Sequence, residues 1–251
     1  MQETYRSPWM TEDLDMLRTT ARRFFEEEVA PKAAKFRAQH HIDRDVWEKA
    51  GELGLLCMSI PEEYGGMGAS FAHEVVVMEE QARICDTTFG FIPGGVNGPA
   101  FFHGTASPEQ LKRWMPGIAA GKQMLCVCIT EPDAGTDVKA MRTTARREGD
   151  EYVLNGNKIF ITLGQQADLA LVAARTGAPG SGAKGISLFM VETAKTPGFK
   201  VNKVLEKIGQ NAMNTAEIFL EDARVPAENL IGGVEGKGFF QLMDVFTRER
   251  L

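Results

Sequence analysis

The segment Cys128-Ile-Thr-Glu-Pro-Asp-Ala-Gly-Thr-Asp-Val-Lys-Ala140 combines hydroxyl side chains with the backbone N–H groups of a turn. It leaves an apolar run, 125–130, that is typical of a buried strand. Thr130 and Thr136 lie around the turn, and hydroxyls with free N–H groups suit a phosphate or the polar edge of a heteroaromatic ring. The two aspartates of the segment weigh against a phosphate unless both carboxylates point away. An ordinary strand-ending turn is the alternative interpretation.

Other motifs that carry chemistry are absent from the sequence. It contains no Gly-x-Ser-x-Gly nucleophile elbow, no P-loop and no His-Glu-x-x-His. Gly236-Lys-Gly238 lacks the third glycine and the preceding strand of a dinucleotide fingerprint, so we interpret it as a linker. The cysteines at 57, 85, 126 and 128 show no disulfide or zinc spacing, and the histidines add no metal pattern. We therefore expect no metal and a reducing compartment, assigned as the cytoplasm.

Length and composition indicate a soluble globular protein of one or two domains. The chain has 251 residues, 43% hydrophobic and 25% charged, and its net charge of −6 does not favour nucleic-acid binding. The N-terminus has neither the basic nor the apolar region of a secretory signal. Residues 87–108 carry no charge over a length that can span a bilayer, but Pro93 and Pro99 interrupt any helix there. We expect a buried, partly irregular segment and no membrane span.

The elements that position the turn follow from the spacing of apolar residues. Helical spacing in the first half predicts helices at 11–31, 46–56, 70–85 and 107–121. Strand-like runs follow at 125–130, 169–174, 186–191 and 216–220. Asn155-Gly156 lies between two β-rich runs and predicts a hairpin. Helical spacing returns over Phe239–Phe246.

Helices followed by strands indicate an α+β fold instead of alternating βαβ units. We expect an N-terminal all-helical domain over 1–122 and a β-barrel-like middle domain over 123–234. Residues 235–251 would be the first helix of a truncated helical bundle. Because this helix ends on its apolar stripe, we expect it to lack its packing partners, to expose a patch along Phe239–Phe246 and to self-associate.

Spelled out in full, the segment at 128–140 resembles the signature of the acyl-CoA dehydrogenases, a family of flavoenzymes. Thr-Glu-Pro is followed by Ala-Gly-Thr-Asp, and further similarities run along nearly all of the chain in the family's order. Those of the helical part are Glu-Glu-Val-Ala-Pro31, Glu-Leu-Gly-Leu-Leu56, Pro-Glu-Glu-Tyr-Gly-Gly66 and Gly-Thr105. Those of the strand part are Asn-Gly-Asn-Lys-Ile-Phe-Ile-Thr162 and Val225-Pro-Ala-Glu-Asn-Leu230.

The resemblance implies an FAD site. The residues that it assigns to FAD are Val127, Cys128, Ile129, Thr130, Gly135, Thr136, Phe160, Ile161 and Thr162. Thr130 would lie near the pyrimidine edge and Thr136 near the pyrophosphate and CoA. Phe160 would pack on the isoalloxazine ring, and Thr162 would bond near N5, the hydride acceptor, where donors favour the reduced flavin. Asp133 departs from the family's usual glycine and brings a charge near the cofactor, and Phe160 departs from its usual tryptophan.

The resemblance also implies a reaction of fatty acid metabolism, the α,β-dehydrogenation of an acyl-CoA thioester, with electrons passed to an electron-transfer flavoprotein. A carboxylate with a raised pKa removes the α proton. The family places this base in a distant C-terminal loop or in the first helix of its C-terminal domain, where Glu249 falls, and both positions stay open. Thr136, Thr247 and Arg250 would bind the substrate. The glycines of 89–102 suggest room for a broad or branched acyl chain.

The C-terminal bundle, largely missing from this sequence, leaves alternatives open. In the family it supplies part of the flavin site and most contacts of a homo-oligomer, a dimer or tetramer. The chain is alternatively a non-catalytic or split-subunit protein that needs a partner chain, a truncated product, or a flavin oxidase or monooxygenase on the same fold. Thr130, Thr136 and Thr162 favour flavin, whereas nothing before residue 251 proves CoA.

Overall fold

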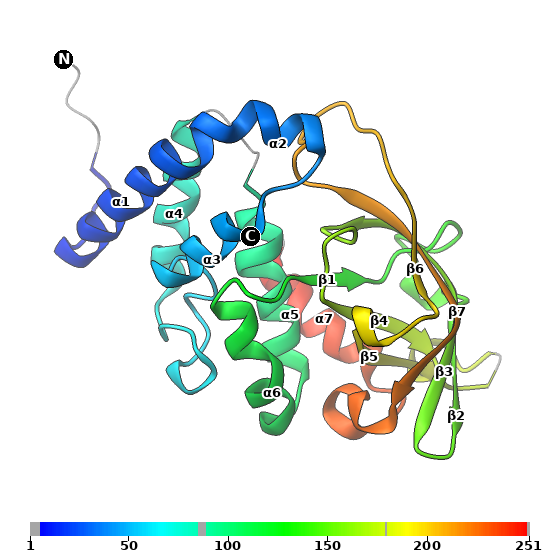
Figure 1. Cartoon of the computed structure of the whole chain (residues 1–251). Coiled ribbons are helices and arrows are strands. Elements are labelled where there is room, and N and C mark those ends of the chain that lie inside the picture. Colours follow the sequence, from blue (N-terminus) through cyan, green and yellow to red (C-terminus); the bar gives the residue numbers. More distant parts are fainter. Residues whose placement is uncertain (1–5, 85–88, 179, 250–251) are drawn as a thin grey trace.

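The computed structural model describes residues 6–84, 89–178 and 180–249. A helical half and a sheet half lie side by side (Figure 1), which confirms the α+β class expected from the sequence. The helices of the first half are α1 (Glu12–Phe24), α2 (Ala33–Gln39), α3 (Arg44–Glu52), α4 (Phe71–Arg83), α5 (Gly98–Thr105) and α6 (Pro108–Ala119). A further helix, α7 (Gly238–Glu249), follows the sheet.

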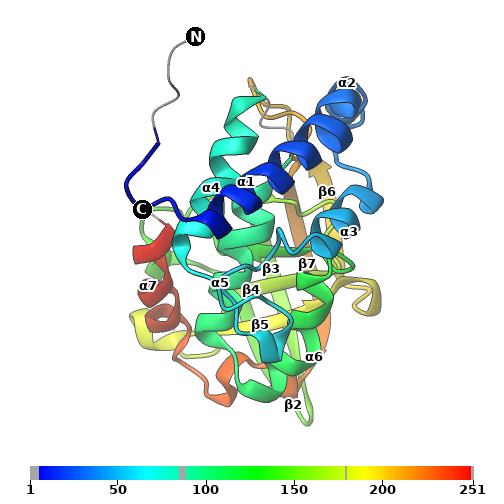
Figure 2. The ribbon, with the colours of Figure 1, turned by 90° about the vertical axis from the view of Figure 1, so that its left-hand side faces the viewer.

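The first predicted helix is interrupted near Pro31, as expected. After α1 the chain widens into a π-helical turn over Phe25–Val29 and tightens into a 3-10 turn over Ala30–Lys32 before α2 begins. Proline has no N–H for a helical hydrogen bond, which explains the break. α1 lies alongside α4 in both ribbon views (Figure 2), where Arg22 Nε lies 2.9 Å from an oxygen of the buried Glu80 carboxylate.

The described part of the uncharged segment, 89–108, is mostly buried, as expected, but it is more helical than predicted. It forms a π-helix over Phe91–Asn97 that continues directly into α5. Pro99 lies in the first turn of α5, where no intrahelical N–H is required, so it starts this helix and does not break it. Across the part of the chain that the structure describes, no helix combines the length and the apolar character needed to cross a membrane.

The described residues of the second half form one seven-stranded sheet of order β1-β4-β2-β3-β7-β6, with β5 paired to β4. Its strands are β1 (Leu125–Cys128), β2 (Thr144–Glu148), β3 (Glu151–Thr162), β4 (Leu169–Arg175), β5 (Ile186–Glu192), β6 (Phe199–Val204) and β7 (Thr215–Pro226). β1 and β4 are parallel, whereas β2–β3, β3–β7, β4–β5 and β6–β7 are antiparallel. In Figure 1 β1, β4 and β5 run across the direction of β3 and β7, so the sheet curls in the barrel-like manner expected.

Asn155-Gly156 does not form the predicted hairpin. β3 runs through both residues and pairs with β7 on either side of them, with a register shift between Leu154 and Gly156. A Cβ on Gly156 would lie 2.3 Å from the Thr143 hydroxyl, so close packing explains the glycine here. The hairpin turn lies at 149–150, between β2 and β3, where Gly149 takes a left-handed φ of 62°.

β4 is buried on both faces and separates two cores. Leu169 and Leu171 belong to the core shared with the N-terminal helices and α7, whereas Ala170 and Val172 belong to a second core within the sheet. The alternation of side chains along a strand produces this division.

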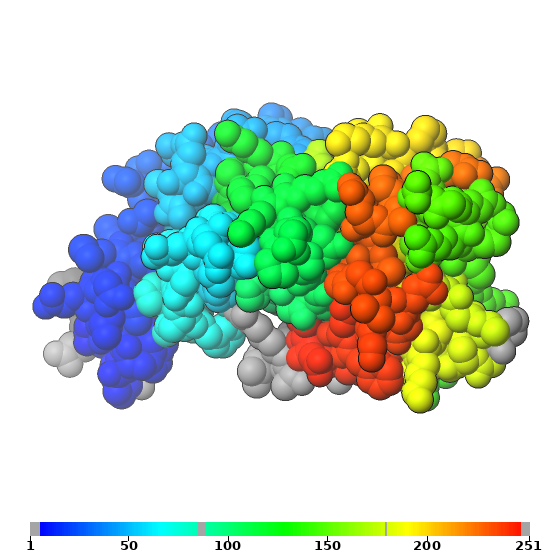
Figure 3. Space-filling view, turned by 90° about the horizontal axis from the view of Figure 1, so that it is seen from below, coloured from blue at the N-terminus to red at the C-terminus, as the bar shows by residue number. Residues whose placement is uncertain are grey.

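α7 is partly covered, in contrast to the open apolar patch expected from the sequence. Leu242 is buried in the core shared with the helical half, and Phe246 packs edge-on against Phe101 of α5, with ring centroids 5.4 Å apart. Figure 3 shows the orange and red C-terminal segment lying between the green residues of the helical half and the yellow residues of the sheet half. Phe240 stays exposed, at 47%. α5 and β5 thus cover part of the apolar stripe of α7, and self-association through Phe239–Phe246 stays a prediction.

The helical and sheet halves are bonded together at the start of α6. Ser107 and Gln110 form a capping box, in which the Ser107 hydroxyl accepts from the Gln110 N–H and the Gln110 amide oxygen accepts from the Ser107 N–H. The Gln110 amide nitrogen then donates to the carbonyl oxygens of Glu228 and Leu230, at 2.9 and 2.8 Å. One side chain thus both begins a helix and joins it to the segment after β7.

Candidate functional site

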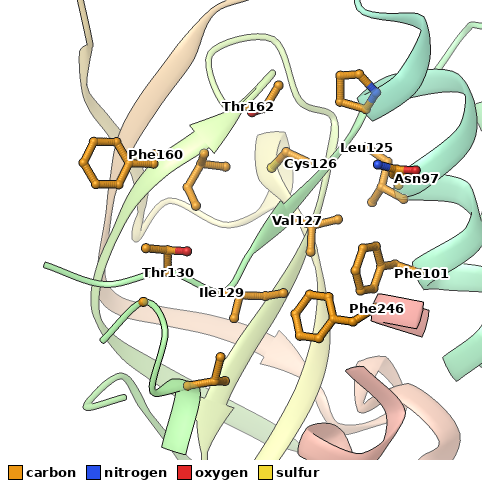
Figure 4. A pocket seen from close by; sticks show the side chains of 15 residues that line it. Asn97, Phe101, Leu125, Cys126, Val127, Ile129, Thr130, Phe160, Thr162 and Phe246 are labelled. Atoms are coloured by element: carbon orange, nitrogen blue, oxygen red, sulfur yellow. The ribbon is translucent and has the colours of Figure 1, made fainter. Parts of the chain in front are cut away.

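A cavity of about 250 Å³ opens between β1, β3 and the turn after β1 on one side and α5 and α7 on the other (Figure 4). Of the residues that the sequence assigned to FAD, those in its wall are Val127, Ile129, Thr130, Gly135, Phe160, Ile161 and Thr162. The helical side adds Asn97, Phe101 and Phe246. Segments that are far apart in the chain therefore meet at one place.

β1 contributes Leu125, Cys126 and Val127 to the cavity wall. Leu125 and Val127 pack toward the helical half, whereas Cys128 is fully buried in the second core. The Cys128 Sγ lies 3.6 Å from the Cys126 Sγ. The contact between the two thiols, together with burial, raises the pKa of Cys126, so this thiol stays protonated. Cys128 can reach a ligand in the cavity only through its backbone.

The turn after β1 is held by two backbone bonds between Glu131 and Ala134, of 2.9 and 3.1 Å. Gly135 lines the cavity, but Thr136 is exposed and lies outside its wall. The Asp133 carboxylate pairs with Arg142 at 3.2 Å, and both side chains are exposed. The charge of Asp133 is thus neutralised at the surface instead of facing a bound group in the cavity.

Phe160 lies in a bulge of β3. Lys158 pairs with Ile218 and Ile161 with Ala216, so β3 has one residue more than β7 over this stretch. Phe160 takes a left-handed φ of 61°, which is uncommon for a residue with a side chain. Its ring is 64% exposed and lines the cavity. The bulge therefore presents an aromatic ring at the cavity instead of burying it in the sheet.

Two hydroxyls in the wall are available to a ligand. Thr130 follows β1 and Thr162 ends β3, and both are half-buried. Neither hydroxyl forms a hydrogen bond with the rest of the described chain. A hydroxyl of this kind can donate to a carbonyl or ring nitrogen and can also accept a hydrogen bond.

A buried ion pair lies directly behind the cavity wall, and the sequence analysis missed it. Lys158 is fully buried, and its Nζ lies 2.8 Å from Glu131 Oε1 and 3.0 Å from the Ile129 carbonyl oxygen. The Glu131 carboxylate also accepts from the backbone N–H groups of Arg142 and Thr143, at 2.6 and 3.0 Å. Burial lowers the pKa of Lys158; burial alone would raise the pKa of Glu131, but Lys158 and the backbone donors outweigh it and hold that pKa below its usual value.

The glycines of 89–102 give less room than the sequence suggested. A Cβ on Gly94 would lie 2.6 Å from the Trp47 ring, and one on Gly95 would lie 3.1 Å from Leu56. These neighbouring side chains already occupy the space. The inference that these two glycines make room for a broad or branched acyl chain was wrong.

The residues assigned to catalysis and substrate binding near the C-terminus are only partly described. Thr247 and Glu249 belong to the backbone of α7, but their side chains lie outside the described part, as does the whole of Arg250. Phe246, just before them, lines the cavity. Over the described residues, no group of three or more His, Cys, Asp or Glu side chains is arranged to hold a metal.

Two family models match the chain in the order of its two halves. The acyl-CoA dehydrogenase N-terminal domain matches residues 11–122, and the acyl-CoA dehydrogenase middle domain matches residues 126–223. The chain belongs to the acyl-CoA dehydrogenase family. Its cavity lies where the two matched domains meet, because Phe101 falls in the first match and Thr130 and Thr162 fall in the second.

Similar acyl-CoA dehydrogenases are known as sequences and as structures. The mitochondrial long-chain specific acyl-CoA dehydrogenase of Sus scrofa is 41% identical over 238 residues, which cover 94% of this chain and 55% of the relative. A crystal structure of an acyl-CoA dehydrogenase from Geobacillus kaustophilus has a TM-score of 0.91 and 38% identity, covering 98% of this chain and 64% of that one. The structure of an acyl-CoA dehydrogenase from Bacillus anthracis complexed with FAD has a TM-score of 0.86 and 31% identity, covering 96% and 41%. The chain thus spans little more than half the length of the curated acyl-CoA dehydrogenase that it matches.

Proposed function

We propose that this chain forms the FAD- and acyl-CoA-binding part of an enzyme that dehydrogenates acyl-CoA thioesters between the α and β carbons. The observation that carries the proposal is the cavity at the junction of the two matched domains, with the unpartnered Thr130 and Thr162 hydroxyls and the Phe160 ring in its wall. The relative of the same fold that was crystallised with FAD supports flavin as the ligand.

The donor set and the shape of the cavity fit the ring system of a flavin. Val127, Ile129 and Phe160 offer apolar surface to a flat aromatic ring, and the two hydroxyls offer donors to its polar edge. The cavity volume of about 250 Å³ is below the roughly 300–1,000 Å³ of a pocket for a complete small ligand. It therefore takes part of the cofactor, and surface outside it must hold the rest.

Each residue has a defined task in this proposal. FAD supplies a hydride acceptor when bound. Thr130 and Thr162 donate hydrogen bonds that stabilise negative charge on the ring, Phe160 covers one face, and Ile161 keeps water out from the buried side. Gly135 lets the turn approach closely, and Cys128 contributes its backbone. Thr136, exposed beyond the cavity, would bind the pyrophosphate and CoA.

The substrate-binding residues follow from the position of α7. Phe246 lines the cavity, and Glu249 lies three residues further on, which places both on one side of a helix. Glu249 is therefore a candidate for the base that removes the α proton, and Thr136, Thr247 and Arg250 are the proposed substrate-binding residues. The second candidate is a glutamate in the longer C-terminal part that the family's full-length members have.

The remaining parts of the proposal concern organisation and partners. Residues 1–122, 123–234 and 235–251 correspond to the N-terminal domain, the middle domain and the start of the C-terminal domain. Electron-transfer flavoprotein is the proposed acceptor, and a dimer or tetramer the proposed assembly. The free thiols of Cys57, Cys126 and Cys128 support a reducing compartment such as the cytoplasm.

The visible absorption spectrum of the purified chain tests the proposal, before and after anaerobic addition of a panel of acyl-CoAs. Flavin bands that bleach with one thioester would establish dehydrogenation and identify the acyl chain. Rapid recovery of the bands in air with formation of hydrogen peroxide would indicate an oxidase instead. A chain that stays colourless in excess FAD would contradict a flavin site that the chain forms alone and would direct attention to a partner chain.

A further inference from the structure

We infer that the buried pair Glu131–Lys158 is a brace that fixes the two β walls of the cavity relative to each other, and that both residues act as positioning residues for the bound flavin. The first wall is 129–131, and the second is 158–162. That the cavity holds flavin rests on the proposed function, whereas the brace itself rests on the contacts below.

Consecutive residues of one wall are bonded to consecutive residues of the other. Lys158 Nζ donates to the Ile129 carbonyl oxygen at 3.0 Å and to Glu131 at 2.8 Å. Between these bonds, the Ile159 N–H donates to the Thr130 carbonyl oxygen at 3.0 Å. Ile129 and Thr130 themselves line the cavity, so the bonds set where these side chains stand.

Glu131 extends the brace to a third segment. Its Oε2 accepts from the Arg142 N–H and its Oε1 from the Thr143 N–H, in addition to Lys158. Thr143 is joined in turn to β4, because its carbonyl oxygen accepts from the Arg175 N–H at 2.7 Å. One carboxylate therefore ties the turn after β1 to β3 and to the entry of β2.

The brace also explains how an unfavourable backbone conformation persists. Phe160 has a left-handed φ of 61° and an exposed ring, so its own packing contributes little to holding it there. A strained residue keeps its conformation only when the structure on both sides determines it. Lys158, fully buried, and Ile161, 2% exposed, are the anchors on either side. The position of the ring in the cavity thus depends on Lys158.

Stability alone does not account for this pair. Apolar side chains of similar volume in place of a buried ion pair are often as stable or more so, whereas removal of one partner leaves a buried charge. This asymmetry separates positioning from stability in an experiment. Lys158→Met is expected to destabilise the fold, and the double variant Glu131→Met/Lys158→Met is expected to regain much of that loss, although neither restores the bonds to Ile129, Arg142 and Thr143.

The control is Glu80→Gln, which removes another buried carboxylate, 2% exposed, that is ion-paired to arginines and lies between α1 and α4. Amide hydrogen exchange of the chain without FAD is the first readout. Exchange at 129–131, 142–143 and 158–162 is expected to rise about tenfold in Lys158→Met and in the double variant, and not in Glu80→Gln. Exchange at wild-type rates there in the double variant would overturn the brace, whatever happens to stability.

FAD affinity and the visible spectrum of the bound flavin are the second readout. We expect Lys158→Met and the double variant to bind FAD at least about tenfold more weakly than the wild-type chain and to alter the shape of its visible absorption bands. Glu80→Gln is expected to bind FAD normally. Faster exchange with unchanged affinity and spectrum would overturn the positioning role. If the wild-type chain binds no FAD, the flavin site that the chain was proposed to form alone is contradicted, and the exchange measurement still decides on the brace. Should Lys158→Met not fold, the double variant and Glu131→Gln provide the same test.

Discussion

Replacing Phe160 by glycine and by alanine separates the backbone role of this residue from its contact with the ligand. Both variants remove the ring, but only glycine adopts a φ of 61° without steric cost. The left-handed conformation costs residues other than glycine about 1–2 kcal/mol. Glycine loses more conformational entropy on folding, which destabilises the glycine variant by roughly 0.5–1 kcal/mol and offsets part of this difference. We therefore expect Phe160→Gly to be more stable than Phe160→Ala by about 0.5–1 kcal/mol, or about 2 °C in Tm.

The same two variants are expected to lose FAD affinity equally. A phenylalanine side chain presents about 200 Å², so 64% exposure leaves about 130 Å² for a ligand to cover. If a flavin ring covers half of this surface, the contact is worth about 1.6 kcal/mol, or about a fifteenfold change in Kd. Quenching of flavin fluorescence measures the affinity, and urea unfolding without FAD measures the stability.

Two results would refute this reasoning separately. Wild-type FAD affinity in both variants would show that the ring does not touch the flavin. An alanine variant as stable as the glycine variant would show that the left-handed conformation of the bulge is not what the native backbone adopts.

Thr162→Val keeps the side-chain volume but removes the hydroxyl, and should weaken FAD binding or slow flavin reduction about fivefold; unchanged reduction kinetics would exclude the contact. If Glu249 is the base, Glu249→Gln abolishes exchange of the acyl-CoA α proton with D2O, whereas normal exchange assigns the base to the longer C-terminal part of the family's full-length members. Gly94→Ala should lower the free energy of unfolding by about 1–3 kcal/mol, because its Cβ would lie 2.6 Å from the Trp47 ring; a neutral effect in urea would show that the segment has room. Although burial opposes it, the pKa of Glu131 is lower in the folded state than in the unfolded state. Ionised Glu131 therefore stabilises the fold above its unfolded pKa, and this contribution is lost as the pH falls through its folded pKa. Lys158→Met should move this loss to higher pH in an acid titration followed by circular dichroism, and an unshifted curve would argue against the pair.

The sequence was informative wherever local pattern determines structure. Ser107 begins a helix because its hydroxyl caps α6, and the apolar run at 169–174 forms a strand because β4 is buried on both faces. β6 escaped prediction because it is a mostly exposed edge strand, whose lysines and asparagine give no apolar run. The hairpin prediction at Asn155-Gly156 was wrong because this dipeptide is also found where close packing, here against Thr143, requires the glycine.

Long-range contacts limited the prediction of the candidate site. The wall residues Thr130 and Thr162 were found through a resemblance, since nothing in their spacing shows that β1 and β3 meet at a cavity. The brace was detectable in principle, because Glu131 and Lys158 are opposite charges next to apolar strand segments, but only the structure shows that they are 2.8 Å apart. Thr136 was assigned to the FAD site by the resemblance, but the structure places it outside the cavity wall.

Titration of the purified chain with FAD, beside a Thr130→Val/Thr162→Val variant, tests most directly whether this cavity binds flavin. We expect the wild-type chain to quench flavin fluorescence saturably and to shift the visible bands, and the variant to bind at least about tenfold more weakly. Absence of saturable binding, or equal binding by both proteins, would contradict a flavin site in this cavity.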